Sequence, residues 1–252
     1  MPWRVFAASA TGPSHREDGR PCQDAFAYRA DADNLIAVVC DGAGSCEQSQ
    51  VGARVVSDSV VHAIATQLAT DLIRSDSSPE QWRTVVETVV SSAREALQAI
   101  AKAAAADLSA YASTLVGAVA WPSRLLFFHV GDGYAVARPR APDAPDIVSL
   151  PENGEYVNET YFVTGSEWQL HLRVTSHDLP IETVVLMSDG AASFAIAKGR
   201  QELHRPFIDP VQRYLDQASE AEGTAALART LEDPRTDAIT TDDKTLLIAR
   251  WR

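Results

Sequence analysis

The sequence predicts an α+β fold, and three observations support this prediction. The chain has 252 residues, 46% of them hydrophobic, which is enough to build one sizeable core. Segments rich in β-formers are joined by short turns typical of antiparallel hairpins. Helical segments come in pairs between blocks of strands, whereas a parallel sheet would alternate single strands with single helices. We therefore expect a single domain over residues 1–252.

The first half of the chain is expected to form three strands and then two helices. The strands are predicted around Val5–Ser9, Phe26–Arg29 and Leu35–Cys40, and the last is an almost unbroken apolar run of the kind buried on both faces. Apolar residues then recur at helical spacing over Ser49–Leu72. A second amphipathic helix is predicted to begin at Pro79, since proline is favoured in the first turn.

The second half returns to strands. A hairpin is predicted from Thr114–Trp121 and Leu125–Val130, joined at Pro122-Ser123. A small irregular region is expected over Ile147–Val174. The remaining predicted elements are strands at Tyr134–Arg138, Thr183–Ser188 and Thr245–Trp251, and helices around Pro206–Ala218 and Thr224–Leu231.

Composition excludes several classes of protein. A net charge of −12 with no cluster of Lys and Arg argues against a nucleic-acid partner. No apolar run reaches the roughly 20 residues of a membrane-spanning helix, and the first residues lack the apolar core of a signal peptide, so we expect a cytoplasmic protein. Cys22, Cys40 and Cys46 are expected to be free thiols. None has an arginine six residues later, which excludes a cysteine-dependent phosphatase.

Aspartates recur at the edges of predicted apolar strands. Asp41, Asp132 and Asp189 each precede a glycine after such a strand, and Asp242 and Asp243 precede the last strand. A single Asp-Gly is usually a hairpin turn, but repetition at four places suggests that the strand ends meet. Several ionised carboxylates together would repel one another unless a cation joined them. Oxygen ligands alone favour Mg²⁺ or Mn²⁺ over zinc.

Six motifs in order resemble the metal-dependent Ser/Thr protein phosphatases of the 2C type. They are GPSHREDGRPCQDAF, VVCDGAGS, ASTLVGAV, HVGDG, LMSDG and DDKTLLI, and the resemblance spans residues 10 to 250. The opening motif is most similar to the stand-alone bacterial branch. The resemblance implies a central antiparallel β-sandwich flanked by pairs of helices, with a metal centre at one end and a flap-like region at about 147–175.

The resemblance also implies a ligand set for two ions. Asp41 would bridge both ions, and Gly42 would offer its carbonyl oxygen. Asp189 and Asp242 would complete the first ion's shell, with Asp243 as the alternative to Asp242 if the alignment shifts by one residue. Bridging hydroxide would then attack phosphorus, so no protein nucleophile is needed.

Two further aspartates match weaker positions of the family pattern. Asp132 corresponds to a ligand of a third ion, shared with Asp189. Asp24 is retained as a ligand through water, although Gln23 replaces the acidic residue that often precedes it. This replacement is expected to weaken one metal site.

The basic residues depart further from the pattern. The family's phosphate-binding arginine aligns with Gly19, so we expect the neighbouring Arg20 to take that role, with a solvated loop charge as the alternative. Animal-type relatives carry a histidine after the first Asp-Gly, and here Ala43 stands there. His129 is expected to be a hydrogen-bonded structural residue. The segment 151–165 is either a substrate-recognising flap or a plain surface loop.

The resulting hypothesis is a metal-dependent enzyme that hydrolyses phosphoserine and phosphothreonine. Its partners would be phosphoprotein substrates and possible Ser/Thr kinases or their targets, and a monomer is the default because nothing in the sequence marks an interface. Asp41, Asp189 and Arg20 are the predicted catalytic residues. The alternative is a catalytically weak, phosphatase-like binding or sensing module.

Overall fold

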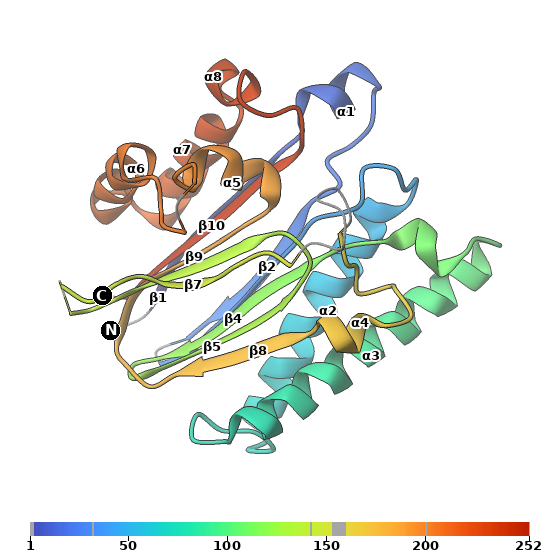
Figure 1. Cartoon of the computed structure of the whole chain (residues 1–252), viewed down its shortest axis with the longest axis horizontal. Coiled ribbons are helices and arrows are strands. Elements are labelled where there is room, and N and C mark those ends of the chain that lie inside the picture. The colour runs from blue at the N-terminus through green and yellow to red at the C-terminus, as the bar shows by residue number, and fades with distance from the viewer. Residues whose placement is uncertain (1–2, 32, 142, 153–159, 200, 252) are drawn as a thin grey trace.

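Two five-stranded antiparallel sheets stack face to face with helices on their outer sides (Figure 1). The computed structural model describes residues 3–31, 33–141, 143–152, 160–199 and 201–251. The first sheet has the order β1 (Trp3–Ala10), β10 (Lys244–Trp251), β9 (Ile181–Met187), β6 (Tyr134–Pro139) and β7 (Ile147–Ser149). The second has the order β2 (Ala25–Ala30), β3 (Leu35–Cys40), β4 (Leu115–Trp121), β5 (Arg124–Val130) and β8 (Arg173–His177).

The space between the sheets is filled by small and branched side chains. Val39 and Phe127 from the second sheet pack with Leu186 and Leu247 from the first, and all four are buried. Alternate residues of the same strands face outward into the two helical layers, so central strands such as β3 are apolar throughout. This explains the unbroken apolar runs in the sequence.

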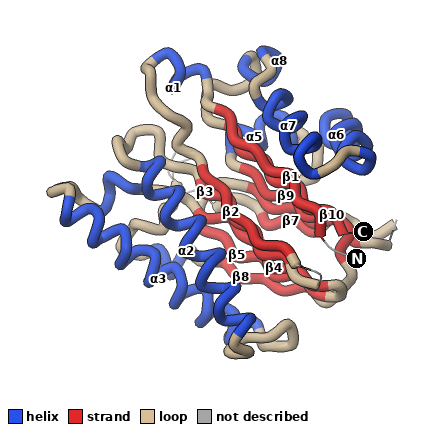
Figure 2. The backbone as a smooth tube through the Cα atoms, turned by 180° about the vertical axis from the view of Figure 1, so that it is seen from behind, coloured by secondary structure: helices blue, strands red, loops and turns tan. Residues whose placement is uncertain are grey.

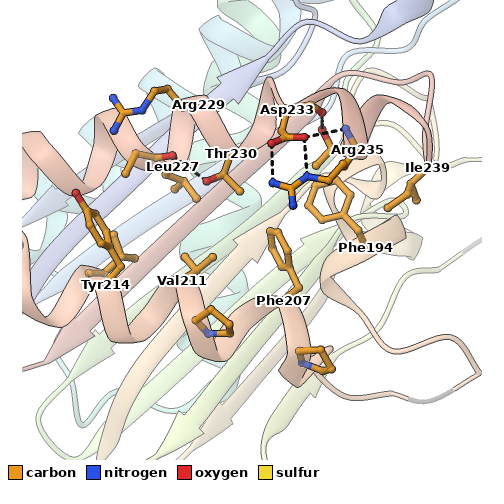
Figure 3. A pocket seen from close by; sticks show the side chains of 15 residues that line it. Phe194, Phe207, Val211, Tyr214, Leu227, Arg229, Thr230, Asp233, Arg235 and Ile239 are labelled. Atoms are coloured by element: carbon orange, nitrogen blue, oxygen red, sulfur yellow. Dashed lines mark hydrogen bonds and ion pairs between the residues drawn. The ribbon is translucent and has the colours of Figure 1, made fainter.

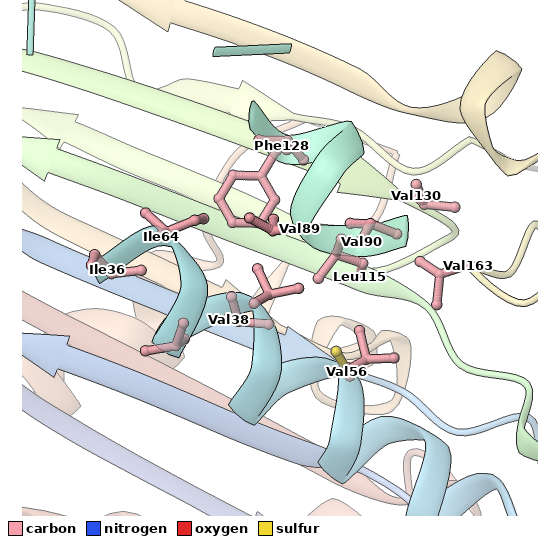
Figure 4. Packing of buried hydrophobic residues seen from close by; sticks show 14 of the residues in the cluster. Ile36, Val38, Val56, Ile64, Val89, Val90, Leu115, Phe128, Val130 and Val163 are labelled. Atoms are coloured by element: carbon pink, nitrogen blue, oxygen red, sulfur yellow. The ribbon is translucent and has the colours of Figure 1, made fainter. Parts of the chain in front are cut away.

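Two long helices cover the second sheet. They are α2 (Ser49–Ala69) and α3 (Pro79–Ala103), and Val56 and Val90 on them meet Val38 and Phe128 of the sheet (Figure 4). The start of α3 is fixed by a capping box, in which the Ser78 hydroxyl accepts a hydrogen bond from the Gln81 amide while the Gln81 side chain reaches back.

Shorter helices cover the outer face of the first sheet (Figure 2). They are α5 (Asp189–Ala195), α6 (Arg205–Gln217) and α7 (Glu220–Leu231). Gly223 of α7 lies so close to β1 that an added Cβ would stand 2.4 Å from the Phe6 ring. The other short helical segments are α1 (Pro13–Glu17), η1 (Leu108–Tyr111), α4 (Trp168–His171) and α8 (Pro234–Asp237).

Antiparallel pairing brings four strand ends to one edge of the sandwich. The end of β3 pairs with the start of β4, since Val39 lies opposite Val116, and the end of β5 pairs there too. In the other sheet the end of β9 lies beside the start of β10, with Met187 opposite Leu246. The ends of β3, β5 and β9 and the start of β10 are the four that adjoin the aspartate turns identified above.

The predicted α+β sandwich is confirmed, and the predicted strands and long helices agree with the structure to within a few residues. The hairpin at Pro122-Ser123 is confirmed by the pairing of Trp121 with Arg124. The sequence prediction missed α1, α5 and α8, which have four to seven residues and are too short to show a period. It also left most of β8 unassigned, where half-buried polar residues hide the strand pattern.

The cysteines and the helices bear on the predictions made from composition. Cys22, Cys40 and Cys46 are free thiols, as expected. Within the described ranges, the helices are each too short or too polar to cross a lipid bilayer.

Candidate metal centre

A pocket of ≈ 230 Å³ lies at the edge where the four strand ends meet, and five aspartates line it. They come from four separate places in the sequence: Asp41, Asp132, Asp189, Asp242 and Asp243. The fold therefore brings the predicted carboxylates together. The predicted Asp24 is not part of the lining but lies buried against the same turns, where its Oδ2 accepts a hydrogen bond from the Ser188 hydroxyl at 2.7 Å.

The turn at Asp41 and Gly42 is held from both sides. The Asp41 amide donates to the Thr114 hydroxyl at 3.0 Å, and the Thr114 amide donates to the Asp41 carbonyl at 2.8 Å. Thr114 therefore supports the Asp41 turn through two hydrogen bonds. A Cβ on Gly42 would lie 2.5 Å from the Gln23 carbonyl oxygen, so only glycine fits this close approach.

Two glycines pack directly on the backbone that carries Asp242 and Asp243. A Cβ on Gly190 would stand 2.0 Å from the Asp243 carbonyl oxygen, and one on Gly12 would stand 2.3 Å from the Asp242 carbonyl carbon. The Asp189 turn, through Gly190, and the N-terminal segment, through Gly12, thus both pack against the backbone at the start of β10. The relative positions of Asp189 and Asp242 are set by backbone packing, which a side-chain substitution elsewhere cannot easily disturb.

The adjacent aspartates Asp242 and Asp243 have different surroundings. Asp243 is 4% exposed, and its oxygens accept hydrogen bonds from the Gly12 amide at 2.7 Å and the Gln23 amide at 2.5 Å. The His15 ring contacts the same carboxylate at 2.9 Å. Asp242 is exposed, and the nearest hydroxyl that donates to its carboxylate is that of Thr240, at 3.5 Å. Of the two, Asp242 has the freer carboxylate.

Burial and mutual repulsion dominate the electrostatics of the site. Burial raises the pKa of Asp24 to about 7, although the hydrogen bond from Ser188 opposes the shift. Burial also raises the pKa of Asp41 well above its ordinary value, and the charges of Asp24 and Asp189 add to the shift. The pKa of Asp189 is raised by burial as well. No Lys or Arg of the described residues forms an ion pair with any of these three carboxylates, so their charge is uncompensated by the protein.

One buried oxygen in this region lacks a partner. Asp24 Oδ1 accepts no hydrogen bond from any described residue, although Asp24 is only 8% exposed. A buried acceptor without a donor is costly unless water or a cation meets it. No three Asp, Glu, His or Cys side chains of the described segments form a ready-made group that could hold a metal ion.

Asp132 is hydrogen-bonded to a residue of segment 151–165. The Thr160 hydroxyl donates to Asp132 Oδ2 at 2.5 Å, and Thr160 and Phe162 line the same pocket. The expectation for segment 151–165 falls partly on residues 153–159, which lie outside the described part of the chain. Sequence reasoning had not singled out Thr160 or Phe162, because neither belongs to a motif.

The basic residues of the opening motif are distributed differently from the expectation. Arg20 is not among the residues that line the pocket, and its guanidinium donates to the carbonyls of Gly44 at 2.8 Å and Cys46 at 3.4 Å. Arg16 pairs with Asp237 at 2.6 Å. His15 does line the pocket. The structure therefore brings His15, and not Arg20, next to the aspartates.

His129 behaves as predicted. It is fully buried, and its Nδ1 lies 2.9 Å from the Ser149 hydroxyl. Burial lowers the pKa of His129 to about 3, and the nearby charge of Arg173 adds to the shift. A neutral, hydrogen-bonded histidine is a structural residue of the sandwich.

Two larger hollows also open on the described part of the molecule. A hollow of ≈ 680 Å³ adjoins it, shares Asp132 and Asp189, and has Lys198 on its wall. A groove of ≈ 660 Å³ between α6, α7 and α8 is mainly apolar, with Phe207, Val211 and Ile239 on its walls (Figure 3). The charged residues Asp233 and Arg235 in this groove pair with each other at 2.8 Å, so they offer little free charge for catalysis.

Comparison with known proteins gives consistent matches along the whole chain. A sequence model described as "Protein phosphatase 2C" matches residues 11–232. "Serine/threonine-protein phosphatase 3" of Escherichia coli (strain K12) is 29% identical over 263 residues, covering 100% of this chain and 99% of that protein.

Two solved structures illustrate the likeness of fold. Serine-threonine phosphatase 2C from Toxoplasma gondii has a TM-score of 0.69 at 13% identity and covers 100% of this chain and 95% of its own. The catalytic domain of the serine threonine protein phosphatase PstP, solved with two manganese ions, has a TM-score of 0.62 at 14% identity and covers 99% and 98%. At such low sequence identities, the two structures show a similarity of fold and nothing more.

Proposed function

Because this chain belongs to the protein phosphatase 2C family, whose model matches residues 11–232, we propose that it is a metal-dependent hydrolase of phosphoserine and phosphothreonine in proteins. The observation that carries the proposal is the convergence of five aspartates from distant parts of the sequence on one pocket. Phosphoprotein substrates follow from this activity. A kinase partner, a monomeric state and a cytoplasmic location remain expectations from the sequence.

The residues present fit divalent metal ions of the Mn²⁺ or Mg²⁺ class. The donor set is made of carboxylate and carbonyl oxygens, which these ions prefer. The pKa values of Asp41 and Asp189 are raised, and Oδ1 of Asp24 is a buried acceptor without a donor. Each of these three carboxylates would be stabilised by a nearby cation. Two or three ions would meet this need.

We assign the ligands from the local geometry. The ions would be held directly by Asp41, the Gly42 carbonyl, Asp189 and Asp242. We choose Asp242 over Asp243 because Asp242 has the freer carboxylate of the two. Asp132 is proposed to help hold a further ion. Asp24, which accepts a hydrogen bond from Ser188, would contact the ions through a water molecule. Bound ions would supply a bridging hydroxide as the nucleophile and neutralise charge on the phosphoryl oxygens.

The chain's own residues hold this arrangement in place. Thr114 fixes the backbone of Asp41, and Ser188 links Asp24 to β10 by accepting a hydrogen bond from the Thr245 amide at 3.0 Å. Asp243, with both oxygens engaged, is proposed to position its neighbours instead of binding an ion. Arg20 stays a prediction as a phosphate-binding residue, and its guanidinium would first have to release the Gly44 carbonyl.

The test is Mn²⁺-dependent hydrolysis of p-nitrophenyl phosphate and of a phosphoserine peptide. Both activities should be lost when the metal is chelated and in the Asp189→Ala variant. Asp58→Ala, which changes an exposed aspartate on α2, is the matched control and should leave both activities unchanged. A folded, Mn²⁺-loaded protein that hydrolyses neither substrate would overturn the proposal and favour a binding or sensing module.

A further inference from the structure

The first observation concerns the buried ring of His15 in α1. Its side chain is 11% exposed, and its Nδ1 lies 2.9 Å from Asp243 Oδ2. A lone histidine is often only a packing residue. Here, however, the ring is held by a carboxylate 228 positions away and also lines the aspartate pocket.

The second observation is that Asp243 cannot easily turn away from this ring. The Gly12 amide donates to Oδ1 at 2.7 Å, and the Gln23 amide donates to Oδ2 at 2.5 Å. Gly190 also packs on the Asp243 backbone, as described above. The carboxylate is therefore fixed on several sides, and the Nδ1 contact sets the orientation of the His15 ring. A carboxylate that holds one imidazole nitrogen leaves the other to face the reacting atoms.

The third observation is where that second nitrogen lies. An added Cβ on Gly44, in the loop that walls the pocket, would have His15 Nε2 as its nearest neighbour, at 3.9 Å. Nε2 makes no hydrogen bond to any residue that the structure describes. Among the described residues lining this pocket, His15 is the only one with a basic side chain. Of the hydroxyls on this wall, that of Thr160 already donates to Asp132, and that of Thr114 accepts a hydrogen bond from the Asp41 amide.

We propose that His15 is a catalytic residue whose Nε2 donates a proton to the seryl or threonyl oxygen of the substrate, with Asp243 as its positioning residue. This inference rests on the proposed phosphatase function. In the step, a water oxygen forms a bond to phosphorus, and the ester P–O bond breaks with its electron pair going to the side-chain oxygen. That oxygen takes the proton from Nε2, and the proton released when the next water ionises to hydroxide restores the ring. The products are the free hydroxyl and inorganic phosphate.

A comparison of leaving groups tests the proposal on the full-length, Mn²⁺-loaded protein. A seryl oxygen needs a proton to leave, whereas p-nitrophenolate is stable without one. We expect His15→Gln to lower kcat for a phosphoserine peptide about 100-fold. The same variant should lower kcat for p-nitrophenyl phosphate by less than about 5-fold, because general acid catalysis then has little to contribute. Mn²⁺ affinity, measured by calorimetry, should stay within about 3-fold of wild type.

A matched control and two more variants make the result decisive. His62→Gln changes an exposed histidine of α2 and should leave both substrates unaffected. Asp243→Asn should show the same preference for the p-nitrophenyl substrate, with a smaller loss of about 10-fold on the peptide. His15→Ala opens space in a buried site, and added imidazole should restore peptide hydrolysis at least about 10-fold without changing p-nitrophenyl phosphate hydrolysis.

The outcomes separate this inference from the function on which it rests. If the wild type hydrolyses neither substrate with Mn²⁺, the proposed function fails. If the wild type hydrolyses both and His15→Gln loses both equally, with no imidazole rescue of His15→Ala, the function stands and His15 is only structural. If His15→Gln does not fold, the rescue experiment with His15→Ala decides alone.

Discussion

The protein treats carboxylates in two opposite ways at neighbouring places. At the end of α8, the partly exposed Asp237 meets the fully buried Lys244 at 2.5 Å and Arg16 at 2.6 Å. Burial acts to raise the pKa of Asp237, but the hydrogen bonds and charges of Lys244 and Arg16 together outweigh it and hold the pKa below its ordinary value. In the aspartate pocket, Asp41 and Asp189 have no such partner among the described residues, and their pKa values are raised by burial.

The contrast shows that the pocket is incomplete by itself. The fold can place a lysine against an aspartate, as Lys244 demonstrates only one residue away from Asp243. Uncompensated buried carboxylates cost stability, so a cluster of them is reasonable only if a cation from solution joins them. The predictions below test this difference between a carboxylate partnered by the protein and carboxylates left for an ion.

The largest effect is expected from Asp41→Asn. It keeps the size of the side chain and removes the charge that we assign to both ions. Phosphatase activity should fall by at least about 1,000-fold, since both nucleophile and charge stabilisation depend on those ions. Calorimetry should show that Mn²⁺ binding is lost while the circular dichroism spectrum is unchanged. Retained Mn²⁺ affinity would contradict our ligand assignment.

Lys244→Met should act on stability rather than on metal binding. It leaves Asp237 with only Arg16, in a place where the removed ammonium was fully buried. Breaking a buried pair from one side costs about 3–5 kcal/mol, and the remaining Arg16 and partial exposure of Asp237 place this variant at the lower end, at about 3 kcal/mol. Urea unfolding without metal measures the loss. Arg16→Ala is the control, because this exposed residue should contribute less than about 1 kcal/mol.

Mn²⁺ should stabilise the wild type and fail to stabilise Asp189→Ala. An ion that binds only the folded protein adds about 2.7 kcal/mol at a concentration 100 times its dissociation constant. Thermal unfolding with Mn²⁺ and with a chelator gives the difference as a shift in Tm. Lys244→Met should show the same Mn²⁺-induced increase in Tm as the wild type, although its Tm without metal is lower. An equal shift in Asp189→Ala would place the ions elsewhere.

The smallest effect is a pH-dependent difference between the wild type and Asp24→Asn without metal. The folded pKa of Asp24 is raised from 3.8 to about 7, so the stability linked to its protonated form is fully present below about pH 4 and is lost as pH rises through about 7. The substituted amide is neutral at every pH and can still accept a hydrogen bond from Ser188. We expect nearly equal Tm values at pH 4.5 and a higher Tm for Asp24→Asn at pH 8.

The opposite pH trend is expected at the partnered carboxylate. The pKa of Asp237 is lowered, so the stability it contributes is present above its ordinary pKa and is lost as pH falls through its lowered pKa. Asp237→Asn should therefore unfold at a lower Tm than the wild type at pH 7, and the difference should shrink as pH falls below the ordinary pKa of aspartate. Together, Asp24→Asn and Asp237→Asn would show whether the pH dependence of stability has opposite signs in the two regions.

Much of this arrangement could be predicted from the sequence. Repeated Asp-Gly turns after apolar strands indicated the shared pocket, and the apolar runs gave the strands of both sheets because central strands are buried on two faces. The role of Asp243 could not be predicted, since it depends on the amides of Gly12 and Gln23, which only the folded chain brings near. His15 is a related case, because its partner lies at the other end of the sequence.

The central position of β10 has a consequence for how the protein is made. β10 lies between β1 and β9, although it follows every other element in the sequence, and Asp242 immediately precedes it. A growing chain that has emerged only as far as α8 therefore exposes two unpaired strand edges, which are prone to associate with other chains. It also lacks one wall of the pocket. During translation the enzyme should thus remain inactive, and dependent on protection from aggregation, until β10 is inserted.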